Sequence, residues 1–389
     1  MFRAWSGGKV QMGHLSDAAD SRLLEFLLNN PNQDLYDAED AGTVFRFLTS
    51  WLAFSGKNCR LTGNPRMKER PVGDLVDALR TLGCSIDYEE EEGFPPLRFS
   101  GFHYSGISEI RISRKTSSQF ISSLMMAAPV LPQGLRIRMD SEGGSFPYLE
   151  LTAGMMQDCG MEVHLNLEEV YIRQQEWKPA LIPAESDWSS ASYFYAILAQ
   201  LPAGSSFSFP GLRLQSRQGD RVMAEIAEYF GVTSEENSGG ILARKVKNFS
   251  GGTGWTYNFR DCPDLALTAL CAAAASGISC DFSGLASLKI KESSRLEAMR
   301  AELERAGKKL QILENGDRAL LEGGRINWPQ KAPAFDVYND HRMAMALCIL
   351  LAGIPGRAAS FSQPEVVKKS FPGFWQELSK AGFQAEPGG

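Results

Sequence analysis

Long apolar stretches recur along the chain, and each of them opens with a polar or acidic residue. A helix that is apolar on every side belongs in the protein interior. Ser, Thr and Asp are residue types that cap the first turn of a helix. The pattern therefore predicts five buried helices with regular spacing. Their opening residues, which lie 75, 72, 74 and 76 positions apart, are Thr43, Ser118, Ser190, Asp264 and Asp340.

A second series of helices is amphipathic, and each of these helices ends at a glycine. Glycine readily adopts the left-handed conformation that terminates a helix. The predicted helices cover residues 75–83, 149–160, 221–231, 295–307 and 374–382, and their closing glycines are 77, 71, 76 and 75 residues apart. Two interleaved series with one period predict a unit of about 75 residues that contains two helices and several strands.

The repeated unit predicts an α/β fold with mixed sheets, used five times, with a helix at residues 23–30 left from an incomplete first unit. A chain of 389 residues also exceeds what one hydrophobic core usually serves. Pro179 and Pro183 interrupt the pattern after the third unit, so we predict two domains, 1–182 and 183–389. A solenoid without a binding site is the alternative, but solenoid repeats are usually shorter.

The charge distribution favours a small anionic ligand. A net charge of −6 argues against a nucleic-acid partner. Basic residues nevertheless concentrate in short motifs at 66–70, 291–295, 341–342 and 368–369.

Cysteine and histidine usage indicates a reducing compartment and no metal. The seven cysteines are scattered, odd in number and never in a CxxC pair, and the four histidines are far apart. The N-terminus has no signal-peptide pattern, and the apolar stretches are too short to span a bilayer. We therefore expect a cytoplasmic protein without a membrane partner.

The predicted helix starts offer a reason for anion binding. Their first N–H groups lack partners within the helix, and the helix dipole adds positive charge there. If the units of each domain are arranged alike, these helix starts converge, and we expect an anion-binding cleft between the two domains. The alternative is that each cap stabilises only its own helix, by about 1 kcal/mol.

Three cations, Arg66, Lys68 and Arg70, precede a helix that is predicted to begin near Pro71. The guanidinium group of arginine binds carboxylate and phosphate through two parallel hydrogen bonds. A solvated surface turn is the alternative for this motif.

Lys291 and Arg295 are four residues apart at the start of a predicted helix, where they would repel each other and oppose the dipole. A bound anion would compensate this arrangement, and Glu292 can pair with Arg295. For Arg342 the alternatives are a local contact with Asp340 and a side chain that points into the cleft. Asp264 is either a helix cap or a general base.

At these motifs the sequence resembles the 5-enolpyruvylshikimate-3-phosphate synthases. The matching segments occur in the order of that family. They are residues 40–46 (DAGTVFR), 66–71 (RMKERP), 117–120 (SSQF), 185–194 (ESDWSSASYF), 263–264 (PD), 291–295 (KESSR), 338–345 (YNDHRMAM) and 369–372 (KSFP).

The resemblance implies two domains, each with three βαβαββ units, that close on the substrates. It implies transfer of the enolpyruvyl group of phosphoenolpyruvate to the 5-hydroxyl of shikimate 3-phosphate, with release of phosphate. It also implies no organic cofactor and no metal. We expect these two small molecules to be the partners of a monomer.

The resemblance also implies roles for individual residues. Asp264 would accept the proton of the attacking hydroxyl, and Glu292 would take part in proton transfer at the methylene carbon. The residues implied to bind phosphoenolpyruvate are Gly42, Thr43, Arg66, Gln119, Arg295, Arg342 and Lys369. Those implied to bind shikimate 3-phosphate are Ser117, Ser118, Gln119, Ser145, Tyr148, Asp264 and Lys291.

One departure from the family pattern keeps alternatives open. The first family motif, Pro-Gly-Ser-Lys-Ser-x-Ser-Asn-Arg, has no counterpart, and residues 1–9 match the end of the helix that follows it. A catalytically impaired or non-catalytic homologue is therefore the alternative to an active synthase. A transferase that acts on UDP-N-acetylglucosamine is a further alternative. That family usually carries a cysteine in its phosphoenolpyruvate loop, and none of the seven cysteines lies beside Arg66.

Overall fold

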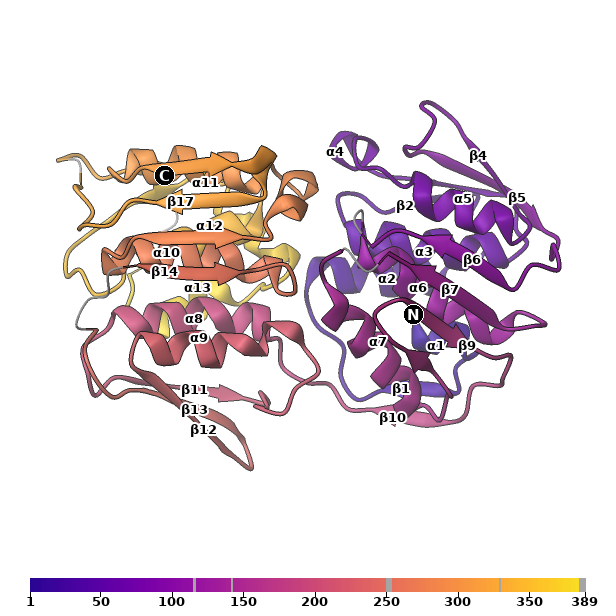
Figure 1. Cartoon of the computed structure of the whole chain (residues 1–389), viewed down its shortest axis with the longest axis horizontal. Helices are drawn as coiled ribbons and strands as arrows, with labels where there is room; N and C mark the ends of the chain where they lie inside the picture. The colour runs from indigo at the N-terminus through magenta and orange to yellow at the C-terminus, as the bar shows by residue number, and fades with distance from the viewer. Residues whose placement is uncertain (115–116, 141–142, 250–253, 329, 385–389) are drawn as a thin grey trace. The chain divides into compact units, whose positions relative to one another are not determined.

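The structure, a computed structural model, describes the chain except for residues 115–116, 141–142, 250–253, 329 and 385–389 (Figure 1). The chain divides into two compact units, unit 1 over Met1–Ala184 and unit 2 over Glu185–Gly389. The sequence places the boundary after residue 182, and the division of the structure falls after Ala184. Each unit has its own hydrophobic core.

Unit 1 contains two four-stranded sheets with one topology. In each sheet the first two strands are parallel and the other pairs are antiparallel. The first sheet, in the order β2-β3-β5-β4, and its helices are β2 (Leu35–Asp37), α3 (Gly42–Phe54), β3 (Cys59–Thr62), α5 (Gly73–Thr81), β4 (Cys84–Tyr88) and β5 (Leu97–Phe102). The second, in the order β6-β7-β9-β8, has β6 (Glu109–Ile112), α6 (Ser118–Ala127), β7 (Leu135–Met139), α7 (Phe146–Asp158), β8 (His164–Leu165) and β9 (Glu169–Ile172).

The beginning and the end of unit 1 are joined by a parallel strand pair, in which Val10 of β1 lies opposite Ala180 of β10. The helix predicted at residues 23–30 corresponds to α2. The remaining elements of unit 1 are α1 (Phe2–Trp5), β1 (Val10–Met12), α2 (Ala19–Asn29), α4 (Pro65–Lys68) and β10 (Ala180–Ile182).

Unit 2 contains the same four-stranded topology once more, in the order β14-β15-β17-β16. Its elements are β14 (Trp255–Asn258), α10 (Ala266–Ser276), β15 (Cys280–Ser283), α11 (Arg295–Arg305), β16 (Leu310–Leu313) and β17 (Arg318–Leu321). The other elements are α8 (Trp188–Gln200), β11 (Ser206–Pro210), α9 (Met223–Tyr229), β12 (Val232–Asn237), β13 (Gly240–Lys245), β18 (Ala334–Phe335), α12 (His341–Leu347), β19 (Ser360–Phe361) and α13 (Phe374–Lys380). The recurring order of strands and helices is consistent with the predicted unit of about 75 residues.

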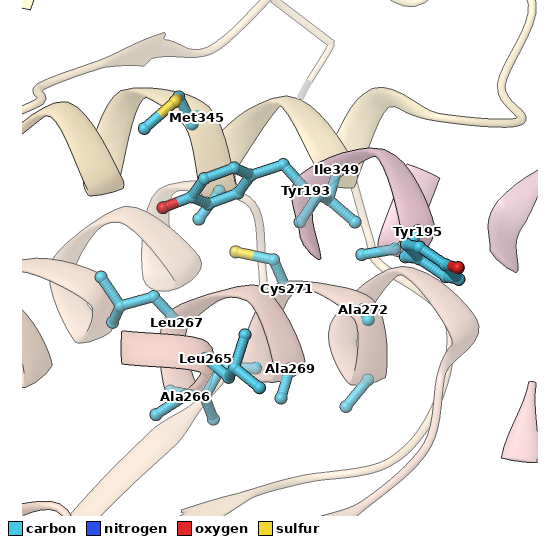
Figure 2. Close-up of a cluster of buried hydrophobic side chains, with 14 of the residues drawn as sticks. Tyr193, Tyr195, Leu265, Ala266, Leu267, Ala269, Cys271, Ala272, Met345 and Ile349 are labelled. Carbon is cyan, nitrogen blue, oxygen red and sulfur yellow. The ribbon is translucent and has the colours of Figure 1, made fainter. Parts of the chain in front are cut away.

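The helices predicted to be buried form the interior of each unit. In unit 2, α10 packs against both α8 and α12. Figure 2 shows Tyr193 of α8, Cys271 of α10 and Met345 of α12 in one apolar cluster. Buried polar groups are generally hydrogen-bonded, and the cores contain paired hydroxyls. Ser50 and Ser123 lie 2.7 Å apart between α3 and α6. No helix in the described part of the chain is both long and apolar enough to cross a membrane.

Most of the predicted helix-opening residues are displaced from the real caps. Asp340 caps α12 as predicted, by accepting a hydrogen bond from the backbone N–H of Arg342. The caps of α6 and α8 are Ser117 and Asp187, which precede the predicted Ser118 and Ser190. Each cap is the residue with extended backbone angles, and a run of several polar residues does not reveal which one adopts them.

Two other predicted caps do not cap a helix. Helix α3 begins at Gly42, before the predicted Thr43, and its N-cap is Ala41, which has no capping side chain. Asp264 lies in the 3₁₀ helix η3 (Pro263–Leu265) ahead of α10 and directs its carboxylate to arginine side chains. The charge of these distant partners outweighs the local capping preference of the aspartate.

The predicted closing glycines all adopt the left-handed conformation. The φ angles of Gly83, Gly160, Gly231, Gly307 and Gly382 are 102°, 74°, 79°, 76° and 93°. At Gly83 a side chain would also overlap the carbonyl oxygen of His103, the residue that directly follows β5. This prediction is confirmed.

Replacing Gly83 by alanine is expected to destabilise unit 1 by about 3 kcal/mol, because backbone strain and a steric overlap add together. Gly56 is the matched control, since its φ is 68° and a Cβ there would meet nothing within 4 Å. Gly56→Ala should therefore cost only about 1 kcal/mol. Urea denaturation measures both losses, and equal losses would contradict the role given to the contact with His103.

Candidate functional site

Arg295, the first residue of α11, is a buried cation that three carboxylates surround. Its side chain is 2% exposed. The Nε atom donates to Oδ2 of Asp340 at 2.8 Å, and the Nη1 atom donates to Oδ1 of Asp264 at 3.0 Å. The Nη2 atom donates to Oε2 of Glu292 at 2.7 Å. Every edge of the guanidinium group thus meets an acidic oxygen.

The segment before α11 differs from the prediction in one respect. The helix begins at Arg295, and Lys291 has extended backbone angles after the 3₁₀ helix η4 (Ala286–Ile290). The predicted helical face shared by Lys291 and Arg295 is therefore wrong. The predicted pair of Glu292 and Arg295 is confirmed. Internal carboxylates compensate Arg295 at the helix start, where the sequence suggested a bound anion.

Asp264 links Arg295 to two more cations. Its Oδ2 atom accepts a hydrogen bond from Nη2 of Arg342 at 3.1 Å, and its Oδ1 atom lies 3.6 Å from Nζ of Lys291. Glu292 extends the group, because its Oε1 atom lies 4.0 Å from Nζ of Lys369. Cations and carboxylates thus alternate in one cluster.

Asp340 positions two arginines in different ways. Its side chain is fully buried and accepts hydrogen bonds from Ser293 at 3.0 Å and from the backbone N–H of Arg342 at 2.9 Å. The guanidinium group of Arg342 contacts Asp264 and also donates to the hydroxyl of Tyr193 at 3.4 Å. The local contact suggested by the sequence therefore involves the backbone of Arg342, while its side chain is directed elsewhere.

The surroundings shift the acidities of these groups. Burial alone would raise the pKa of Asp264, but the three neighbouring cations, with Arg342 the strongest, hold it well below its usual range. Burial likewise opposes the ionised form of Asp340, and Arg295 still lowers its pKa. Asp264 raises the pKa of Lys291, but burial and the neighbouring guanidinium groups lower it more. Both aspartates are therefore carboxylates at neutral pH.

We call the following seven residues the unit 2 charge cluster: Asp264, Lys291, Glu292, Arg295, Asp340, Arg342 and Lys369. It contains four cations and three carboxylates, which gives one net positive charge. The adjacent His341 is buried, and burial lowers its pKa to about 4, so it adds no charge at neutral pH.

In unit 1, Gln119 joins the starts of α3 and α6. Its Nε2 atom donates to Oγ1 of Thr43 at 2.9 Å, and its Oε1 atom accepts from Nη1 of Arg46 at 2.7 Å. The hydroxyl of Ser117 accepts from the backbone N–H of Gln119 at 3.2 Å. Ser118, the first residue of α6, is buried. The starts of α3 and α6, for which the sequence predicts anion binding, therefore lie together here.

The cationic motif at residues 66–70 divides between the interior and the surface. Arg70 is 5% exposed, and its guanidinium group lies against Gly42, where an added Cβ would be 2.5 Å from Nη1. Arg66 pairs with Glu69 at 2.6 Å, with 38% of its side chain exposed. The absence of a side chain at Gly42 lets Arg70 reach the start of α3.

Ser145 and Tyr148 lie at the start of α7. Ser145 has a left-handed backbone with φ of 63°, and its carbonyl accepts from the backbone N–H of Tyr148 at 3.2 Å. The hydroxyl of Thr152, in the next turn, donates to Ser122 of α6 at 2.9 Å. This hydrogen bond anchors α7 to α6 near the same end.

Sequence reasoning missed several residues that adjoin the unit 2 charge cluster. Tyr193 contacts Arg342, and Ser189, four residues earlier on α8, donates to Asp220. Both lie in the motif at 185–194, where their spacing places them on one helix face. Asp220 lies in the 3₁₀ helix η2 (Gly219–Val222), where no periodic pattern marks it.

Comparison with solved structures identifies the fold. The EPSP synthase from Acinetobacter baumannii superposes with a TM-score of 0.69 at 20% identity, over 90% of this chain and 79% of that chain. The enolpyruvyl transferase NikO from Streptomyces tendae gives a TM-score of 0.62 at 12% identity, over 87% of this chain and 75% of that chain. The fold is therefore that of the enolpyruvyl transferases.

Sequence comparison identifies the family. Residues 18–378 match the family model of EPSP synthase (3-phosphoshikimate 1-carboxyvinyltransferase). The 3-phosphoshikimate 1-carboxyvinyltransferase of Bacteroides fragilis is 38% identical over 100% of this chain and 93% of that protein. That of Cellvibrio japonicus is 36% identical over 88% of this chain and 78% of that protein. The chain belongs to the EPSP synthase family, and the predicted resemblance is confirmed.

Replacing Asp340 by asparagine is expected to lower the free energy of unfolding at pH 7 by about 3–5 kcal/mol, because Arg295 would stay buried with less compensation. Since the pKa of Asp340 is lower in the folded protein than the unfolded value of 3.8, its contribution is present above pH 4 and is lost as pH falls. The variant should therefore lose less stability than the wild type on acidification, as measured by denaturant titration from pH 2 to pH 7.

Asp281→Asn is the matched control. Asp281 also bonds an arginine twice, to Arg318 at 2.8 and 2.6 Å, but both side chains are about a third exposed. Solvent screens such a pair, so its loss should cost far less. Equal losses in the two variants would contradict the importance of the buried arrangement around Arg295.

Proposed function

We propose that this protein is a 3-phosphoshikimate 1-carboxyvinyltransferase of the shikimate pathway. It transfers the enolpyruvyl group of phosphoenolpyruvate to the 5-hydroxyl of shikimate 3-phosphate and releases phosphate. The observation that carries this proposal is the family match over residues 18–378, which includes every residue assigned a role below.

The unit 2 charge cluster supplies the positive charge that such substrates require. Both substrates carry a phosphate and a carboxylate. We assign Arg295, Arg342 and Lys369 to phosphoenolpyruvate and Lys291 to shikimate 3-phosphate. Internal carboxylates already orient these cations before the substrates bind, and Arg295 would exchange one of its carboxylate contacts for a contact with phosphoenolpyruvate.

The reaction has an addition step and an elimination step. In the first, the 5-hydroxyl oxygen attacks C2 of phosphoenolpyruvate, Asp264 accepts the hydroxyl proton, and the methylene carbon gains a proton with Glu292 taking part. In the second, the proton leaves that carbon, the double bond re-forms and phosphate departs. The pKa of Asp264 is low before substrates bind. Substrate anions near its cationic neighbours would raise this pKa and make Asp264 a better base.

In unit 1 we assign a second group of residues to the same two substrates. The start of α6 offers N–H groups and a positive helix dipole, which suit a phosphate or a carboxylate. The residues proposed for phosphoenolpyruvate are Gly42, Thr43, Arg66 and Gln119. Those proposed for shikimate 3-phosphate are Ser117, Ser118, Gln119, Ser145 and Tyr148.

We further propose that the protein works in the cytoplasm as a monomer, with these small molecules as its ligands. All seven cysteines are buried thiols outside disulfides, which suits a reducing compartment.

Purified protein is expected to release phosphate only when both phosphoenolpyruvate and shikimate 3-phosphate are present, with the enolpyruvyl ether detected by mass spectrometry. Replacing Asp264 by asparagine should lower kcat by about 10²–10⁴-fold, because the proton acceptor is lost. Asp261→Asn is the matched control, since Asp261 is exposed and only three residues away.

The control variant should retain wild-type turnover. A wild-type protein that forms no product while a relative of known activity does so in the same assay would contradict the proposed activity. Full turnover by Asp264→Asn would leave the activity standing but contradict the role of Asp264.

A further inference from the structure

Asp220 is a buried carboxyl group for which the proposed mechanism has no use. Its side chain lies in η2, and the residue is 3% exposed. The hydroxyl of Ser189 donates to Oδ2 of Asp220. The Oδ1 atom is buried and has no hydrogen-bond partner among the described residues. A buried acceptor without a partner is costly, so a purely structural role does not account for a carboxyl group here.

Neighbouring residues already perform the structural task at this place. The side chain of Gln218 accepts from the backbone N–H of Trp188 at 2.9 Å and donates to the carbonyl of Ser186, also at 2.9 Å. These two bonds attach the η2 segment to the start of α8. Ser189 needs only a neutral acceptor, which an amide would provide equally well.

Asp220 lies within electrostatic range of the unit 2 charge cluster. The groups that influence it electrostatically are Asp264 from η3, Arg342 from α12 and Asp187 from the start of α8, and Cys262, just ahead of η3, is also close. Helix α8 provides a second link, because Ser189 contacts Asp220 and Tyr193, one turn later, contacts Arg342. The side chain is therefore connected to the same arginine and aspartate that the proposed reaction uses.

The ionisation of Asp220 changes the charge that a substrate meets. The cluster carries four cations and three carboxylates. With Asp220 protonated the sum is one positive charge, and with Asp220 ionised it is zero. Burial, reinforced by Asp264 and opposed by Arg342, raises the pKa of Asp220 to about 7. The change therefore falls near neutral pH.

We propose that Asp220 is a positioning residue whose proton controls the affinity of the unit 2 charge cluster for phosphate-bearing substrates. When Asp220 holds its proton, the cluster has a net positive charge and attracts the anion. When the proton leaves, the carboxylate of Asp220 cancels that net charge and repels the anion. The inference rests on the proposed function for the identity of the ligands.

The variant Asp220→Asn tests this inference, because asparagine has the same size, can accept from Ser189 and does not ionise. At pH 6 wild type and variant should have similar KM values for phosphoenolpyruvate. At pH 8 the variant should have a KM about 5–10-fold lower than that of the wild type, as one charge at close range in a partly buried site would produce. Substrate ionisation affects both proteins equally and cancels in the ratio.

A binding measurement separates affinity from chemistry. Inorganic phosphate, titrated calorimetrically in the presence of shikimate 3-phosphate, gives a complex that cannot turn over. Its Kd should show the same pH-dependent ratio between wild type and Asp220→Asn. Asp261→Asn, which removes a carboxylate at an exposed position, should follow the wild type throughout.

The pH dependence of the free energy of unfolding tests whether Asp220 titrates with a raised pKa. The pKa of Asp220 is raised above the unfolded value of 3.8, so the wild type should lose stability relative to Asp220→Asn as pH rises from about 4 to about 7, and the difference should then stay constant.

The outcomes distinguish the two proposals. Anion binding with the expected pH-dependent ratio, but without turnover, would support the role of Asp220 and contradict the proposed activity. Turnover in both proteins with a KM ratio that is constant from pH 6 to pH 8 would overturn the role of Asp220 and leave the activity intact. Parallel unfolding curves from pH 4 to pH 7 would also overturn it, because Asp220 would then not titrate in that range. A wild type that binds no anion at any pH would contradict both.

Discussion

The buried guanidinium group of Arg295 is the interaction on which the site in unit 2 depends. Its three carboxylate partners come from three places in the chain: Asp264 precedes α10, Glu292 precedes α11, and Asp340 caps α12. One cation therefore fixes the starts of three helices relative to one another. Removing an ion from water is costly, and only close contacts on all sides make such burial favourable. The positions of the three carboxylates around Arg295 are therefore tightly constrained.

The carboxylates around Arg295 also position the other three cations of the cluster. Asp264 orients Arg342 and Lys291, and Glu292 lies near Lys369. The cluster keeps a net positive charge while each of its carboxylates has a cationic neighbour. A site of this kind is prepared for a small anion, because the cost of assembling like charges is met during folding and not at binding. The pKa of the proposed base Asp264 likewise depends on the anions and cations that surround it.

Sequence reasoning could recover those features that depend on local or periodic signals. The apolar helices and the closing glycines recur about every 75 residues, and the structure has both. The helix caps were less accessible, because Ser117 and Ser118 are adjacent and only the backbone angles distinguish them. The spacing predicted Glu292 as a partner of Arg295, but the other two partners could not be derived, since Asp264 and Asp340 are 31 and 45 residues away along the chain. Only the resemblance to the family indicated from the sequence that these motifs belong to one site.

A double-mutant cycle tests the dependence on Arg295 most directly. The free energies of unfolding would be measured at pH 7 for the wild type, Arg295→Met, Asp340→Asn and the double variant. If the buried ion pair organises the site, the two losses should be strongly non-additive, with a coupling energy of about 2–3 kcal/mol, because the second substitution removes a charge that the first has already left uncompensated. Losses that add to within about 0.5 kcal/mol would contradict the claim that the buried ion pair of Arg295 organises the site.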